Sequence, residues 1–356
     1  MQKHVSEIPG AVPRQPMRLL VATDAWHPQV NGVVRTYEHF ARHAEAMGHE
    51  VGFLTPNGRP SLPCPTYPEI RLALITRRGV RRAIERFQPE FIHVATEGPI
   101  GLATRNYCLR AGQPFTTSYH TRFPEYVAAR VPIPERWGYA YMRWFHNAGN
   151  GVMVSTRSLR EELTARGFNN IYDWSRGVDT GQFRPRDVRL FGNDQPVFMF
   201  VGRVAPEKNV GAFLDLDLPG RKVVVGPGPQ LDTLRRRHPD VVFTGPKFGE
   251  ELAAHFASAD VFIFPSLTDT YGVVLLEALA CGTPVAAYPV TGPKDVIVHG
   301  RVGVLDDDLG RAALAALHID RGACREYALK FSWEACTRQL LENIRIAETA
   351  PLRACA

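Results

Sequence analysis

Cysteine is scarce in this chain, and the few cysteines form no recognisable motif. No Cys-x-x-Cys pair occurs among the six, which are Cys64, Cys108, Cys281, Cys324, Cys336 and Cys355. This pattern argues against a zinc site and a disulfide scaffold, and it favours a reducing compartment such as the cytoplasm. Long apolar runs are also absent: no stretch of about 18 apolar residues exists, so we expect no membrane-spanning helix. Residues 1–16 lack the apolar core of a secretory signal, and we expect a flexible segment there.

Charge is limited and spread along the chain. Charged residues make up 22% of the sequence and hydrophobic residues 45%, as in ordinary soluble globular proteins. The 356 residues suffice for two domains, each with its own core. The formal charge of +6 fits anionic substrates or an anionic membrane surface. It is not concentrated in one tail, and no recognised nucleic-acid-binding module is present, so we expect no nucleic-acid partner.

Short apolar runs alternate with amphipathic stretches twice along the chain, which predicts an α/β fold with parallel sheets and helices on both faces. The strands expected in the first half are residues 17–23, 51–54, 91–95, 114–118 and 151–154, and the helices are 33–47, 80–87 and 101–110. The strands expected in the second half are 197–201, 222–225, 241–243, 261–264 and 285–287, followed by a last helix at 332–346. Residues 176–196 are rich in Gly, Pro and Asp and read as a linker. The expected domains are residues 17–180 and 181–330, with a terminal helical segment at 331–356.

The most informative segment is residues 261–284, VFIFPSLTDTYGVVLLEALACGTP. The apolar strand is followed by three residues that can cap a helix, Thr268, Asp269 and Thr270. Asp269 and Glu277 then bracket the start of a helix, separated by roughly seven helical residues or about 10 Å. A helix N-terminus attracts phosphate through its free N–H groups. The arrangement suits a ligand with hydroxyls at both ends and a diphosphate in the middle, as in a nucleotide sugar.

This segment resembles the acid-x7-acid signature of retaining glycosyltransferases of family 4. The resemblance implies the GT-B fold, in which two Rossmann-like domains with parallel sheets face each other across a cleft and the terminal helix crosses back to the first domain. It also implies that Asp269 binds the donor sugar and Glu277 the ribose of the nucleotide. The residues between them that become donor-binding candidates are Thr270, Tyr271, Gly272 and Val273. The family usually has glutamate at the first position, but the Asp-Thr-(Phe/Tyr)-Gly form is similar to a subgroup of bacterial glycolipid-forming and mannosyl transferases.

Two loops of the first half follow predicted strands, where ligands bind in open parallel sheets. Asn31-Gly32 precedes the first helix, so its backbone can approach a phosphate, although Asn-Gly is also an ordinary turn. His120 follows the strand at 114–118. The resemblance implies that His120 touches the donor sugar and supports positive charge at the anomeric carbon, whereas a lone histidine is more often structural. Arg122 and Tyr126 are weaker candidates for binding the acceptor.

Three glycine-containing loops of the second half also follow predicted strands. Gly202-Arg203 and Lys208, in VGRVAPEKN, resemble the family's diphosphate clamp, in which arginine forks onto phosphate oxygens and lysine adds a point charge. The plainer interpretation is a solvated pair of cations. Residues 225–229, VGPGP, resemble a family turn that often carries Asp in the middle. Residues 244–248 are implied to meet the nucleotide base, which makes Lys247 and Phe248 binding candidates.

The resemblance further implies catalysis without a metal or other cofactor, because Arg203, Lys208 and the helix N-terminus neutralise the leaving diphosphate. The Asp-rich segments 215–217 and 306–308 read as solvated loops rather than metal sites. A UDP- or GDP-sugar is then the co-substrate. The acceptor hydroxyl attacks the face from which the leaving group departs, so the anomeric configuration is retained.

The acceptor is the least determined part of the function. Residues 71–86 and 131–146 mix arginine with apolar and aromatic residues, which suits either an interfacial helix on anionic lipid or an ordinary amphipathic helix. With the subgroup resemblance, this favours a membrane lipid such as diacylglycerol as acceptor and a peripheral position on the cytoplasmic face of the membrane. The alternatives are a polysaccharide or small-molecule acceptor, a nucleotide-sugar epimerase of the same fold, and a non-catalytic membrane- or glycan-binding protein. The presence of Arg203, Lys208 and Glu277 together speaks against the last.

Overall fold

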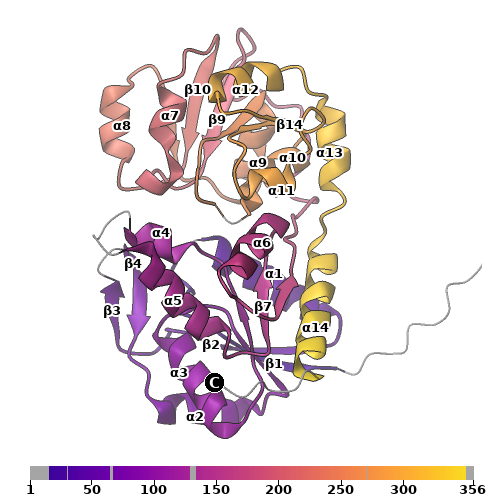
Figure 1. Cartoon of the computed structure of the whole chain (residues 1–356). Coiled ribbons are helices and arrows are strands. Elements are labelled where there is room, and N and C mark those ends of the chain that lie inside the picture. The colour runs from indigo at the N-terminus through magenta and orange to yellow at the C-terminus, as the bar shows by residue number, and fades with distance from the viewer. Residues whose placement is uncertain (1–15, 30, 65–66, 129–133, 270, 350–356) are drawn as a thin grey trace, which may run out of the picture.

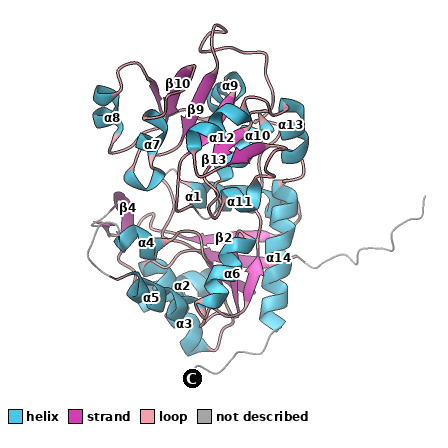
Figure 2. Cartoon of the chain, turned by 45° about the horizontal axis from the view of Figure 1, so that its top comes forward, coloured by secondary structure: helices cyan, strands magenta, loops and turns pink. Residues whose placement is uncertain are grey.

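The structure is a computed structural model that describes residues 16–29, 31–64, 67–128, 134–269 and 271–349 (Figure 1). Two six-stranded parallel sheets dominate it, one in each half of the chain, and helices cover both faces of each (Figures 1 and 2). The α/β architecture with two facing parallel-sheet halves, predicted from the alternation of apolar and amphipathic segments, is confirmed.

The N-terminal sheet has the strand order β2-β1-β5-β6-β7-β8, and every neighbouring pair is parallel. Its strands are β1 (Arg18–Ala22), β2 (Glu50–Leu54), β5 (Phe91–Val94), β6 (Thr116–Ser118), β7 (Gly151–Val154) and β8 (Ile171–Asp173). The helices of this half are α1 (Gly32–Ala46), α2 (Arg77–Phe87), α3 (Pro99–Ala111), α4 (Phe123–Ala128), α5 (Glu135–His146) and α6 (Arg157–Ala165).

The C-terminal sheet has the order β11-β10-β9-β12-β13-β14, again all parallel. Its strands are β9 (Val197–Val201), β10 (Arg221–Val225), β11 (Val242–Gly245), β12 (Val261–Phe264), β13 (Val285–Ala287) and β14 (Gly303–Leu305). Its helices are the 3-10 helix η1 (Pro206–Lys208) and α7 (Val210–Leu214), α8 (Leu231–Arg237), α9 (Gly249–Ser258), α10 (Val273–Ala280), α11 (Pro293–Val296), α12 (Leu309–Ala316) and α13 (Arg321–Ala328). The chain ends in α14 (Trp333–Thr349).

Strand β1 shows why these segments read as continuous apolar runs. Leu19 and Val21 pack into a cluster with α1 and α14, whereas Leu20 and Ala22 pack on the opposite face with α2 and α3. Since both faces are covered, nearly every position of a central strand must be apolar. Strand β9 is buried in the same way, so polar loop residues begin at the carboxyl ends of the strands.

An antiparallel hairpin of β3 (Ser61–Cys64) and β4 (Tyr67–Ala73) is a feature that the sequence pattern did not predict. It overlaps the arginine-rich stretch 71–86, for which a helix was expected, either interfacial or ordinarily amphipathic. That expectation is wrong at its start, because Arg71 to Ala73 belong to β4 and the helix α2 begins only at Arg77, capped by the hydroxyl of Thr76.

Residues 176–196 contain no helix or strand, as expected, but they are not a solvated linker. The side chains of Val178, Phe183 and Phe191 are buried in the core of the C-terminal sheet. Arg176 is buried as well, with 4% of its surface exposed. The segment is therefore part of the folded body and fixes how the two halves meet.

Helix α14 runs down the side of the N-terminal half in both ribbon views (Figures 1 and 2). Trp333, Leu340 and Ile344 join the cluster that also contains Leu19 and Tyr37, so the last helix completes the core of the first sheet. None of the described helices combines the length and apolarity that crossing a bilayer requires.

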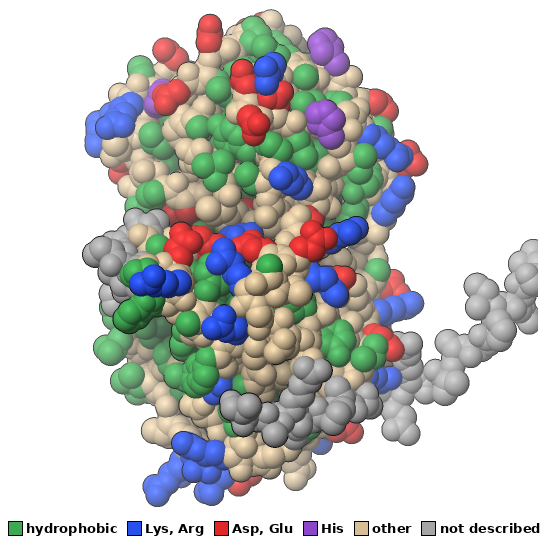
Figure 3. Space-filling model, in the orientation of Figure 1, with side chains coloured by type: hydrophobic (Ala, Val, Ile, Leu, Met, Phe, Trp, Pro, Cys, Tyr) green, Lys and Arg blue, Asp and Glu red, His purple; other side chains and the backbone are tan. Residues whose placement is uncertain are grey.

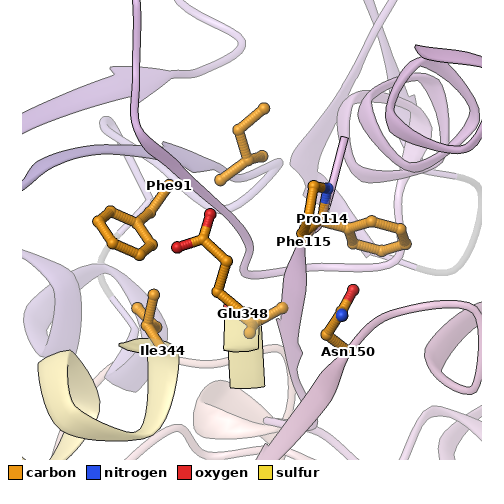
Figure 4. Close-up of a pocket in the computed structure, with 8 residues that line it drawn as sticks. Phe91, Pro114, Phe115, Asn150, Ile344 and Glu348 are labelled. Atoms are coloured by element: carbon orange, nitrogen blue, oxygen red, sulfur yellow. The ribbon is translucent and has the colours of Figure 1, made fainter. Parts of the chain in front are cut away.

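A small hollow lies where α14 meets the amino ends of β5, β6 and β7 (Figure 4). Phe91, Phe115, Asn150, Ile344 and Glu348 line it, and its volume is about 10 Å³. This is room for about one water molecule. It lies at the end of the sheet opposite to the strand ends where ligands of such folds bind.

We predict that Leu340→Ala destabilises the protein by about 2–5 kcal/mol, because Leu340 is fully buried between α14 and the first sheet. Ile346→Ala on the same helix is the matched control, since that side chain is largely exposed. Urea unfolding followed by circular dichroism measures both. Equal effects of the two substitutions would contradict the packing described for α14.

Candidate active site

The loops at the carboxyl ends of both sheets meet at the junction of the two halves, where the surface is hollowed (Figure 3). Direct contacts cross this junction. Arg35 Nη1 of α1 lies 3.4 Å from Glu277 Oε1 of α10. The backbone N–H of Ser158, at the start of α6, donates to Asp295 Oδ1 of α11 at 2.9 Å. Side chains from the two halves therefore share one site.

Helix α10 begins one turn later than the sequence suggested. Its N-cap is Gly272, which adopts a left-handed conformation with φ of +75°, and the cap makes no side-chain hydrogen bond. The prediction that Thr268, Asp269 or Thr270 caps the helix is therefore wrong for Thr268 and Asp269, while Thr270 lies outside the described residues. Because only Val273 onward is helical, the rise of about 10 Å expected between the two acids, which assumes roughly seven helical residues, does not apply here.

Asp269 forms an ion pair with Lys208, which comes from the loop after the neighbouring strand β9. Burial of Lys208 opposes its positive charge, but Asp269, Tyr126 and Glu207 outweigh this and raise its pKa. Lys208 therefore carries a positive charge at neutral pH in a place that water reaches poorly. Tyr126 belongs to α4, so the first half of the chain also faces this lysine.

Close glycine packing holds the loop that carries Lys208. A Cβ at Gly228 would lie 2.2 Å from the carbonyl oxygen of Val204, and a Cβ at Gly226 would lie 2.0 Å from that of Gly202. The N–H of Val204 donates to the carbonyl of Pro227 at 2.8 Å. The VGPGP turn therefore packs directly against the VGRVAPEKN loop. This close backbone packing explains the two glycines of the turn, and it needs no contact from the Asp that the family often has in the middle of the turn.

The remaining residues of this loop complete the cationic edge. Gly202 has a φ of +155° and packs on the ring of Phe200. Arg203 is half-exposed, with its guanidinium 3.9 Å from Glu207. Asn209, with a φ of +50°, donates from its amide to the carbonyl of Pro265 at 3.2 Å and so joins this loop to the one that carries Asp269.

Glu277 is buried in the first turns of α10 and faces the other half of the molecule. Burial raises the pKa of its carboxyl group, and Arg35 opposes that rise. The side chain of Arg35 is 37% exposed, whereas that of Glu277 is 9% exposed. Arg35 is a contact that the sequence reading missed, because an arginine within an amphipathic helix looks like part of its solvated face.

His120 is held at both ring nitrogens. Its Nδ1 lies 3.2 Å from Arg176 Nη2, and its Nε2 lies 3.1 Å from the hydroxyl of Tyr37. The Tyr37 hydroxyl also contacts His93 Nε2 at 2.9 Å. Burial, followed by Arg176, His93 and His146, lowers the pKa of His120 well below its usual value, so the imidazole is neutral.

Comparison with known proteins supports what this geometry suggests. The model of Glycosyltransferase Family 4 matches residues 30–182, and that of glycosyl transferases group 1 matches residues 195–319. The chain is 31% identical over 316 residues to a GDP-mannose-dependent alpha-mannosyltransferase of Mycobacterium tuberculosis, covering 81% of this chain and 83% of the relative. The chain belongs to glycosyltransferase family 4.

Two further relatives act on other substrates by name. The sulfoquinovosyl transferase SQD2 of Arabidopsis thaliana is 29% identical, over 87% of this chain and 70% of its own length. The alpha-monoglucosyldiacylglycerol synthase of Streptococcus pneumoniae is 26% identical, over 85% of this chain and 78% of its own. Glycosyltransferase activity is therefore the common property, and the substrates differ.

Solved structures place the fold of this family 4 member in the GT-B class. Sucrose-phosphate synthase from Thermosynechococcus elongatus superposes with a TM-score of 0.75 at 20% identity, covering 94% of this chain and 99% of that one. The Anabaena protein HepE in complex with UDP-glucose gives 0.69 at 15% identity, covering 93% and 100%. The GT-B fold predicted from the acid-x7-acid segment is confirmed.

Several site residues expected from the family resemblance have structural partners instead of an open face. The Asn31 side chain caps α1 by accepting from the N–H groups of Val33 and Val34, and Gly32 opens that helix. Arg122 binds Glu125 at 3.0 Å and Glu162 at 2.6 Å, so it joins α4 to α6. A role of Asn31, Gly32 or Arg122 in binding substrate stays a prediction.

The residues expected to bind the nucleotide base lie near the start of α9, and those expected to bind the donor lie near the start of α10. Lys247 forms an ion pair with Glu251, while Phe248 is half-exposed at the start of α9. Tyr271 is buried between the two halves, and Val273 is the first residue of α10. These positions too stay predictions as binding residues.

No group of three or more metal-ligating side chains occurs within the part of the chain that the structure describes. The two Asp-rich segments have local partners: Asp308 caps α12, and Asp306 forms an ion pair with Arg311. Four of the cysteines, Cys108, Cys281, Cys324 and Cys336, are free and buried.

We predict that Gly228→Ala destabilises the C-terminal half by about 2 kcal/mol, because the new methyl group collides with the backbone of Val204. The midpoint of thermal unfolding should fall by about 4–8 °C. Gly211→Ala in α7 is the control, since a Cβ there has nothing within 4 Å and alanine favours the helix. If Gly228→Ala is as stable as Gly211→Ala, the close packing of this turn against the VGRVAPEKN loop is refuted.

Proposed function

We propose that this glycosyltransferase is a retaining enzyme that moves a hexosyl group from a nucleotide diphosphate-sugar to a hydroxyl of a membrane lipid. One observation carries the proposal. Lys208 and Asp269, on loops after two adjacent strands, are in contact beside the N-terminus of α10. A sugar held by Asp269 would therefore have its anomeric phosphate next to a partly buried cation and to free N–H groups.

We propose GDP-mannose as the first donor to test, on the similarity to the mycobacterial mannosyltransferase over most of both chains. UDP-sugars are the second class, since the structurally similar HepE was solved with UDP-glucose. In either case Glu277 would bind the ribose hydroxyls. Its contact with Arg35 would then have to loosen or rearrange as the nucleotide enters.

The chain's own residues account for the chemistry without a metal in this proposal. Arg203 and Lys208 lie on one loop, and both would stabilise negative charge on the diphosphate as it leaves. The neutral imidazole of His120 would add no positive charge near an anomeric carbon that is itself becoming positive. The departing phosphate would accept the acceptor's proton, so no general base is assigned. Closure of the two halves would limit donor hydrolysis.

The lipid acceptor is supported by apolar and basic groups on one flank of the N-terminal half (Figure 3). Trp137, Tyr141 and Trp144 of α5 are exposed. Arg105 of α3 stacks on Trp144 at 3.7 Å and so ties α5 to α3, which packs beside α2. The exposed arginines of α2 are Arg77, Arg78, Arg81, Arg82 and Arg86. Aromatic rings beside exposed arginines suit the interface of an anionic bilayer.

An apolar groove adjoins this flank. It has a volume of about 490 Å³ and is lined by the β3–β4 hairpin and the starts of α2 and α3, including Leu62, Leu72 and Leu74. Its end at Pro99 lies one residue from the N-cap of α3, next to the carboxyl end of β5. The apolar chains of a lipid acceptor would bind in this groove while its headgroup enters the site.

We predict that Lys208→Ala and Arg203→Ala each lower kcat on the order of 10²-fold, because each removes a cation that stabilises the leaving diphosphate. Turnover of GDP-mannose and of UDP-sugars with membrane lipid extract, read by mass spectrometry, measures the effect. Arg236→Ala is the control, since Arg236 is exposed on α8. Full turnover in both active-site variants would exclude this mechanism, and conversion of the donor without any acceptor would instead indicate an epimerase.

We predict that Trp137→Ser weakens binding to vesicles of anionic phospholipid about tenfold or more, because a buried indole contributes roughly 2 kcal/mol. Trp137 is 66% exposed, so the substitution removes no core contact. The control is Leu329→Ser, an exposed apolar residue of the C-terminal half. Vesicle co-sedimentation that shows the same loss for both, or for neither, would contradict the membrane face proposed for α5.

A further inference from the structure

Arg176 is a buried cation without a carboxylate partner among the residues that the structure describes. Its Nη1 donates to the carbonyls of Trp174 at 2.7 Å and Ser175 at 3.0 Å, and its Nη2 donates to His120 at 3.2 Å. The guanidinium also lies over the ring of Trp174 at 4.2 Å. Arginine is almost never buried unpaired, and its side chain stays charged in proteins. A buried guanidinium directed at an imidazole therefore calls for a functional reason.

The donor character of Arg176 determines the tautomer of His120. A guanidinium has no acceptor, so the Nδ1 of His120 must accept and carries no proton. The proton is then on Nε2, which donates to the Tyr37 hydroxyl at 3.1 Å. The single proton of the Tyr37 hydroxyl is then available to Ser118 Oγ at 3.2 Å or to His93 Nε2 at 2.9 Å. A second proton on His120 would place two donors face to face, so this geometry admits only the neutral ring.

The chain of hydrogen bonds continues into the first sheet. His93 Nδ1 lies 2.8 Å from the hydroxyl of Thr116, and its Nε2 lies 2.9 Å from the hydroxyl of Ser118. Tyr37, His93, Thr116 and Ser118 are all buried. The direction of donation is thus fixed from Arg176 through His120 to Tyr37, and the contacts at both ring nitrogens hold the ring of His120 in one orientation.

Arg176 also touches the other half of the site. Its backbone interacts with the buried phenol of Tyr271, and its charge acts on the same group. Tyr271 lies in the loop between Asp269 and the start of α10. A single residue therefore contacts His120 from the N-terminal half and the donor-binding loop of the C-terminal half.

We propose that Arg176 is a positioning residue for the transfer reaction: it holds His120 as the neutral Nε2–H tautomer and aligns it with the Asp269–Gly272 loop. This inference rests on the function proposed above. The chemical reason is that a positively charged imidazolium at His120 would destabilise positive charge at the anomeric carbon. Arg176 acts on the sugar only through His120 and the loop.

The environment of His120 gives the expected pH behaviour. The charged and titratable groups that face it are Arg176 from the junction segment, Tyr37 from α1 and His93 from β5, with His146 of α5 also acting on it. Burial and Arg176 are the two largest influences, and both lower its pKa. Without Arg176 one of these two influences is lost, so the pKa of His120 rises and the ring gains a proton at a higher pH than in the wild type, while burial still lowers its pKa.

The test is Arg176→Met, with Arg325→Met as the matched control. Arg325 likewise donates to three backbone carbonyls, those of Thr180, Phe183 and Ala280, but it does not contact His120. Ring-nitrogen NMR of His120, assigned with His120→Asn, should show the Nε2–H tautomer from pH 5 to 8 in the wild type and in Arg325→Met. Arg176→Met should show a mixture of the two neutral tautomers, and its ring should begin to gain a proton at a higher pH than in the wild type.

Kinetics supply a second readout. Arg176→Met should lower kcat about tenfold at pH 8 with a smaller change in donor KM, and its kcat should begin to fall at a higher pH than that of the wild type. Arg176→Lys, which keeps a donor, should retain the Nε2–H tautomer. It also serves as the test variant if Arg176→Met does not fold.

The proposal is overturned if His120 remains entirely the Nε2–H tautomer in folded Arg176→Met, or if Arg325→Met causes the same kinetic loss. If Arg176→Met does not fold, the proposal is overturned when His120 in Arg176→Lys shows a mixture of tautomers, because lysine still supplies a hydrogen-bond donor at this position. The NMR measurement needs no donor substrate. Failure to find any transferase activity would therefore count against the proposed function, and not against the role of Arg176 in fixing His120.

Discussion

The account depends on the contact between Lys208 and Asp269. Each residue sits on a loop at the carboxyl end of a buried strand, and the strands β9 and β12 are neighbours in the C-terminal sheet. The contact needs both loops to be held closely, which the glycines at 202, 226 and 228 allow because no side chain separates the backbones. A sugar diphosphate can enter this arrangement of a partly buried lysine beside an acid at a helix N-terminus, because its phosphate oxygens can replace the carboxylate oxygens that contact the lysine.

A second constraint is that polar contacts join the two halves of the molecule in the part of the chain that the structure describes. Arg35 with Glu277, Ser158 with Asp295 and Arg176 with Tyr271 all cross the junction. Polar contacts of this kind can be exchanged for ligand contacts at modest cost, whereas an apolar interface could not. The structure thus combines rigid sheets with a junction suited to opening and closing.

The sequence predicted the sheets well and the site only in part, for physical reasons. Central parallel strands are apolar at almost every position, so β1, β9 and β12 stand out in the sequence. The hairpin at 61–73 was missed because its prolines and mixed pattern obscure the alternation of an exposed strand. The cap of α10 was misplaced because Gly272 acts through a left-handed backbone and not through a side chain. Arg35 and Arg176 were missed because their partners lie 242 and 56 residues away in the chain.

The most direct test of the central claim is a crystal structure of the protein with a GDP-sugar or UDP-sugar in the junction. The account predicts that the diphosphate lies within hydrogen-bond distance of Lys208 and of the N–H groups at the start of α10, with Arg203 turned toward it, the sugar against Asp269 and the ribose against Glu277. A donor bound elsewhere, or bound at the junction with Lys208 and Asp269 still paired and turned away from it, would contradict the account.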